Sequence, residues 1–104
     1  LTHHEREPVE MEGGTTFHFV TDGIESALDR ARKCAGDKDV LLAGGANTLQ
    51  QYLAAGLVDE FELNISPIVL GAGERLMDNL GDLQVEPIRV IEGPEATHVK
   101  YRVL

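Results

Sequence analysis

Two adjacent glycines between an apolar run and a predicted helix are the sharpest chemical feature of the sequence. The apolar run at 40–43 leads directly into Gly44 and Gly45, and a helical pattern follows at once. Glycines let the backbone turn tightly and approach a ligand closely, and a helix N-terminus offers unpaired N–H groups and a partial positive charge. A phosphate or diphosphate fits such a turn, although a Gly-Gly turn also joins strands to helices for geometric reasons alone. The candidate ligand-contacting residues are Gly44, Gly45, Ala46, Asn47 and Thr48.

A second polar group lies at the start of the chain, where Thr2, His3 and Arg6 follow Leu1. If Leu1 ends a first strand, these residues lie at the same edge of a parallel sheet as the glycine turn and can meet an anion. The alternative is an exposed N-terminal segment that carries ordinary polar residues. His3 and His4 point in different directions on a strand, and no further ligands recur at regular spacing, so no metal site is expected.

The third group is Asn64 and the glycine-rich loop at 67–75. Asn64 lies on the polar side of an alternating strand pattern, where it either faces a pocket or is an ordinary solvent-facing residue. We expect His18 and His98 on solvated strand faces and Cys34 as a buried structural thiol. The sequence contains no Ser-His-Asp order and no paired-carboxylate motif, so the catalytic residues stay unknown.

The elements that must position these residues follow from local patterns. Asp22 and Glu25 form a capping-box-like start to a helix that Gly36 ends, and Gly56 ends the second helix. A continuous apolar run at 40–43 is typical of a strand covered on both faces of a parallel sheet. The patterns predict strands over 15–20, 39–43, 60–66, 83–91 and 97–104, and helices over 23–35 and 46–55. The β-α-β-α-β order predicts an α/β fold with a mostly parallel sheet flanked by helices and a C-terminal antiparallel hairpin.

Composition limits the classes of function. The 104 residues predict a single domain over 1–104, and 18 acidic against 9 basic residues give a formal net charge of −9. Nucleic acids and anionic membranes are therefore not expected as partners. One cysteine excludes an internal disulfide, and a cytoplasmic location is expected. The first residues resemble neither a signal peptide nor a translation start, so we expect the C-terminal part of a longer protein.

Three segments in order, 39–48, 52–60 and 65–73, resemble the riboflavin-biosynthesis reductase C-terminal domain family of the dihydrofolate reductase superfamily. The resemblance implies a dihydrofolate reductase-like fold and an NADPH-dependent oxidoreductase that transfers hydride to a pterin, pyrimidine or related heterocycle. It places 44–48 at the cofactor diphosphate, Thr2, His3 and Arg6 near the adenosine 2′-phosphate, and Asn64 near the substrate.

The same resemblance implies a homodimer. The family's first strand, nicotinamide loop and substrate-contacting residues have no counterpart in this sequence, so the chain alone is expected to be inactive. The alternative is a non-catalytic nucleotide-binding module with the same fold.

Overall fold

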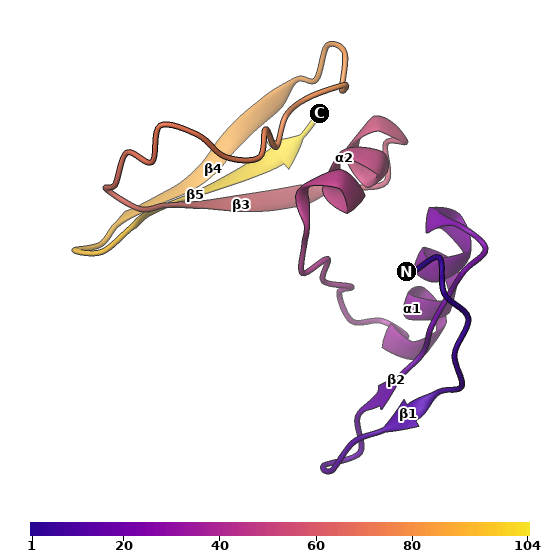
Figure 1. Ribbon diagram of the computed structural model, residues 1–104. Coiled ribbons are helices and arrows are strands. Elements are labelled where there is room, and N and C mark those ends of the chain that lie inside the picture. The colour runs from indigo at the N-terminus through magenta and orange to yellow at the C-terminus, as the bar shows by residue number, and fades with distance from the viewer. The chain divides into compact units, whose positions relative to one another are not determined.

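Two helices and five strands form in the computed structural model, which describes residues 1–104 (Figure 1). The chain divides into an N-terminal unit, Leu1–Leu42, and a C-terminal unit, Ala43–Leu104. The N-terminal unit contains β1 (Val9–Glu10), β2 (Thr16–Phe17) and α1 (Ile24–Ala35). The C-terminal unit contains α2 (Ala46–Ala54), β3 (Glu60–Ile65), β4 (Val85–Glu92) and β5 (Thr97–Val103).

Both predicted helices are confirmed. α1 begins after Gly23 and ends at Gly36, which has a φ of 64° and donates its N–H to the Arg32 carbonyl. A positive φ at a helix end favours glycine, so the sequence marks this boundary locally. α2 contributes Tyr52 and Leu53, which are 7% and 3% exposed, to the core of the C-terminal unit. Burial raises the pKa of the Tyr52 hydroxyl.

The three-stranded sheet has the order β3-β5-β4, and both strand pairs are antiparallel (Figure 1). The predicted C-terminal hairpin is confirmed as β4 and β5. Its turn is closed by the Gly93 N–H, which donates to the Ala96 carbonyl at 2.9 Å. The register shifts between Pro87 and Arg89, where proline lacks the N–H that a regular ladder needs.

The predicted mostly parallel sheet is wrong. β3 pairs antiparallel with β5, and the segment predicted as a strand over 15–20 is reduced to β2, which pairs antiparallel with β1. Residues 39–43 form no strand, and Leu41 is 90% exposed. An apolar run satisfies the composition of a central strand, but a strand also needs hydrogen-bonding neighbours, and no described segment pairs with this one.

Burial is sparse in both units. Val20 in the N-terminal unit and Tyr52 and Leu53 in the C-terminal unit are the buried hydrophobic side chains. Cys34, predicted to be buried, is exposed, because none of the other helices and strands makes extensive contact with α1 and the helix carries no buried residue. Much apolar side-chain area is thus left accessible, including Val69 at 97%.

Candidate functional site

The glycine turn opens directly onto the N-terminus of α2. Gly45 is the residue before the helix, with a φ of −83°, and no side chain caps this end. The Gly45 carbonyl accepts the first helical hydrogen bond, from the Leu49 N–H at 3.0 Å. The N–H groups of the first turn have no partner inside a helix and are the groups that bind anions at helix N-termini.

The space around the two glycines is also open. A Cβ built on Gly44 or on Gly45 would meet no heavy atom within 4 Å. Gly44 has a φ of 129°, a conformation that L side chains rarely adopt, and the peptide bond between the two glycines is cis. A ligand can therefore approach the backbone here without displacing a protein side chain.

The first turn of α2 is held by polar contacts on its own helix and on the loop that follows β3. The Asn47 Oδ1 accepts a hydrogen bond from the Gln51 Nε2 at 2.7 Å. The neighbouring Gln50 donates its Nε2–H to the carbonyl of Arg75, at 2.6 Å. These contacts fix the side chain of Asn47 and tie α2 to the glycine-rich loop, while Thr48 is half-buried.

The candidate residues at the start of the chain are partly fixed by the segment before α1. The Thr2 N–H donates to the Val20 carbonyl at 2.9 Å, and the Thr2 hydroxyl accepts the His4 N–H at 3.2 Å. Thr2 is half-buried, whereas His3 is exposed. Thr2 thus lies beside the stretch that leads into α1.

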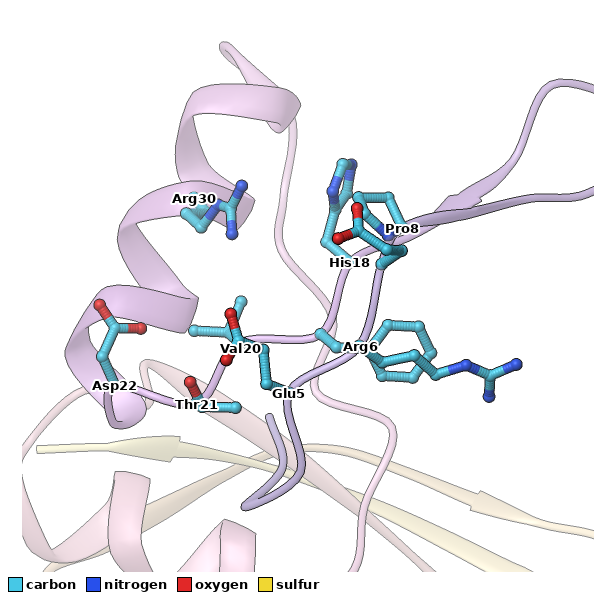
Figure 2. A pocket seen from close by; sticks show the side chains of 10 residues that line it. Glu5, Arg6, Pro8, His18, Val20, Thr21, Asp22 and Arg30 are labelled. Atoms are coloured by element: carbon cyan, nitrogen blue, oxygen red, sulfur yellow. The ribbon is translucent and has the colours of Figure 1, made fainter.

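A pocket of about 460 Å³ lies in the N-terminal unit (Figure 2). Arg30 of α1 and His18 face it from different sides, whereas Arg6 extends away from both (Figure 2). The Arg6 guanidinium carbon lies 5.2 Å from the centre of the Phe19 ring, a cation–π contact. The pocket combines acidic and basic side chains; its lining residues are Glu5, Arg6, Glu7, Pro8, His18, Phe19, Val20, Thr21, Asp22 and Arg30.

Of the three residues predicted at the start of the chain, the pocket includes only Arg6. Arg30 was not predicted as a site residue, and His18 was predicted to lie on a solvated strand face. Arg30 lies on the polar side of a helix, where a basic residue is the ordinary choice, so the sequence offers no signal for its place at a pocket.

Asn64 is hydrogen-bonded to His98, which was predicted to lie on a solvated strand face. Asn64 of β3 lies directly opposite His98 of β5, and the Asn64 Oδ1 is 2.5 Å from the His98 Nδ1. His98 is half-buried rather than solvated. The two residues meet only because of the antiparallel register of β3 and β5, and no local sequence pattern reveals that register.

The rest of this sheet face carries ion pairs. Glu62 pairs with Arg89 of β4, and Glu60 pairs with Lys100 of β5 at 3.0 Å. The hydrogen bond from Lys100, reinforced by its charge, holds the pKa of Glu60 below its usual value. A third pair joins Arg102 to Glu86 at 3.7 Å.

The predicted residues belong to two different units. Thr2, His3 and Arg6 lie in the N-terminal unit, and 44–48 and Asn64 lie in the C-terminal unit. The parallel sheet edge on which the prediction placed the first group beside the glycine turn does not form.

Comparison with known proteins assigns the chain to a family. The family model described as RibD C-terminal domain matches residues 2–99. This chain belongs to the RibD C-terminal domain family. Residues 2–99 include the glycine turn, the N-terminal residues and both members of the Asn64–His98 pair, so the resemblance found in the sequence is confirmed.

One curated relative matches part of the chain. The Bacillus subtilis (strain 168) protein described as "Uncharacterized protein YyaP" is 43% identical over 58 residues. The match covers 56% of this chain and 30% of the YyaP protein.

The RibD C-terminal domain family consists of reductase-like domains of the dihydrofolate reductase superfamily. Such domains generally bind NADPH, and the open glycine backbone before α2 fits the diphosphate of a dinucleotide. No helix of the chain has the length and apolar character needed to cross a membrane.

Proposed function

We propose that this RibD C-terminal domain is the cofactor-binding part of an NADPH-dependent reductase that acts on a pterin, a pyrimidine or a related heterocycle. The observation that carries the proposal is the pair Gly44 and Gly45, open to a ligand and placed directly before an uncapped helix, inside a match to this family over 2–99. NADPH supplies the hydride when it is bound.

The residues of this chain have separate tasks in the proposal. The N–H groups of 46–48 at the start of α2 hold the diphosphate, and the glycines keep side chains out of its path. Asn64 contacts the substrate through its side-chain amide.

Local placement of positive charge matters because the chain carries a formal net charge of −9. A dinucleotide phosphate is repelled by the chain as a whole, so its affinity must come from short-range contacts to backbone N–H groups and a few basic side chains. In the proposal, the backbone N–H groups at the start of α2 supply this contact.

The test is oxidation of NADPH by the full-length protein that carries this chain, with pterins and aminopyrimidines as substrates. We expect loss of the reduced-nicotinamide absorbance that depends on both the protein and the heterocycle, and a Gly45→Val control that oxidises little or none. NADPH binding without oxidation by any heterocycle would contradict hydride transfer and leave a non-catalytic nucleotide-binding module.

A further inference from the structure

The pair formed by Asn64 and His98 is a preorganised polar group on an otherwise charged sheet face. The two residues are direct partners in the antiparallel register of β3 and β5, so their side chains lie on the same face. His98 also lies opposite Ile91 of β4. An amide, an imidazole and an apolar side chain thus form one row across the three strands.

The charged side chains of this face form ion pairs with one another. The carboxylates of Glu60, Glu62 and Glu86 are each ion-paired with a basic residue of the same sheet. The Asn64–His98 row carries no carboxylate and no permanent charge. A neutral polar ligand therefore meets the least competition from charged groups at this row.

The hydrogen bond within the pair determines which groups remain available. Because the Asn64 Oδ1 accepts from the His98 Nδ1–H, the Asn64 Nδ2 keeps its donors and the His98 Nε2 keeps an acceptor lone pair. Gly93, at the turn between β4 and β5, lies beside the imidazole. A Cβ built on Gly93 would lie 2.9 Å from the Ala96 carbonyl oxygen and 3.9 Å from the His98 Nε2, so a side chain at this position would crowd the turn next to the ring.

A donor and an acceptor beside an apolar side chain complement the edge of a planar cyclic amide. A ring carbonyl accepts from the Asn64 amide, a ring N–H donates to the His98 Nε2, and Ile91, 47% exposed, packs on the ring. We propose that Asn64 and His98 together bind the cyclic-amide edge of a heterocycle, with His98 both positioning Asn64 and contacting the ligand. This inference deepens the proposed function and rests on its substrate class.

The first test uses pterin, which carries a ring N–H beside a carbonyl, and 3-methylpterin, in which that N–H is replaced. Nitrogen-15 NMR of the full-length protein reports the His98 ring nitrogens. We expect His98 in the Nδ1–H form, and an Nε2 resonance that moves on addition of pterin and stays in place with 3-methylpterin. Equal responses to the two ligands, or no response of the Nε2 to saturating pterin, would overturn the proposal.

Variants give the second test. We expect Asn64→Leu and His98→Phe each to weaken pterin binding about tenfold or more, because each leaves one polar group of the ligand without a partner. Glu86→Gln breaks an ion pair on the same sheet face and is the matched control, with unchanged pterin affinity. Unchanged affinity in the first two variants would also overturn the proposal.

A parallel NADPH titration separates this site from the proposed function. If pterin binds as expected while NADPH does not bind, the reductase proposal fails and the heterocycle site stands. If NADPH binds and the Asn64 and His98 variants leave pterin affinity unchanged, the site proposal fails and cofactor binding stands.

Discussion

At the scale of single residues, a side chain at Gly45 is expected to affect ligand binding more than folding. Its φ of −83° and ψ of −166° lie in the extended region that any L residue adopts. A side chain there meets no protein atom within 4 Å of its Cβ. A substitution at Gly45 therefore tests the ligand's need for space more directly than it tests the fold.

Gly45→Val is expected to leave the folded structure intact and to weaken NADPH binding by at least about tenfold, or roughly 1.4 kcal/mol, because the branched side chain occupies the diphosphate path. Calorimetric titration measures the affinity, and circular dichroism checks the fold. Wild-type affinity in the folded variant would mean that the diphosphate binds elsewhere.

Lys100→Met tests the ion pair at Glu60 by its pH dependence. The folded-state pKa of Glu60 is lowered by Lys100, so the pair stabilises the fold above the unfolded-state pKa of about 4.5 and this stabilisation is lost as the pH falls through the lower folded-state value. We expect the wild type to lose more stability than Lys100→Met between about pH 7 and about pH 3. Urea denaturation at the two pH values measures this; equal losses would show that the pair is not coupled to folding.

At the scale of elements, a helix or strand could be predicted from the sequence where the interactions that stabilise it lie within its own segment. Both helices could be predicted because caps such as Gly36 and the apolar periodicity lie within the helix sequence itself. The β4–β5 hairpin was also predictable, since its turn is short. The run at 39–43 was not, because a strand depends on partners elsewhere in the chain. The same reason hid the contact of Asn64 with His98, which lie 34 residues apart.

Leu53 lies in a helix that was correctly predicted, and Leu41 lies in a predicted strand that does not form, so the two leucines give a matched pair of substitutions. Leu53 in α2 is 3% exposed and Leu41 is 90% exposed. We expect Leu53→Ala to lower the free energy of unfolding by about 2–3 kcal/mol and Leu41→Ala to change it by less than about 0.5 kcal/mol. Chemical denaturation of each variant, followed by circular dichroism of the whole chain, measures both. A loss at Leu41 as large as that at Leu53 would indicate that the 39–43 segment is buried.

At the scale of the whole molecule, the chain consists of two compact units with few buried side chains. The change of unit falls between Leu42 and Ala43, within the apolar run predicted as a strand. Val69 and Leu70, in the loop after β3, are also nearly fully exposed, at 97% and 83%. Exposed segments outside helices and strands are preferred sites of proteolytic cleavage.

Limited digestion with thermolysin, which cleaves beside large apolar residues, is expected to cut first near Leu41 and near Val69, before any cut at Leu53. Mass spectrometry of the early fragments identifies the order. Early cleavage within α2, or resistance of the 39–43 segment, would contradict the exposed state of this segment.

The central claim is that this chain holds a phosphorylated dinucleotide. Calorimetric titration of the full-length protein with NADPH and with NADH tests it most directly. We predict saturable binding of NADPH at micromolar concentrations, with NADH bound more weakly because it lacks the 2′-phosphate. Absence of binding by either dinucleotide would contradict the account.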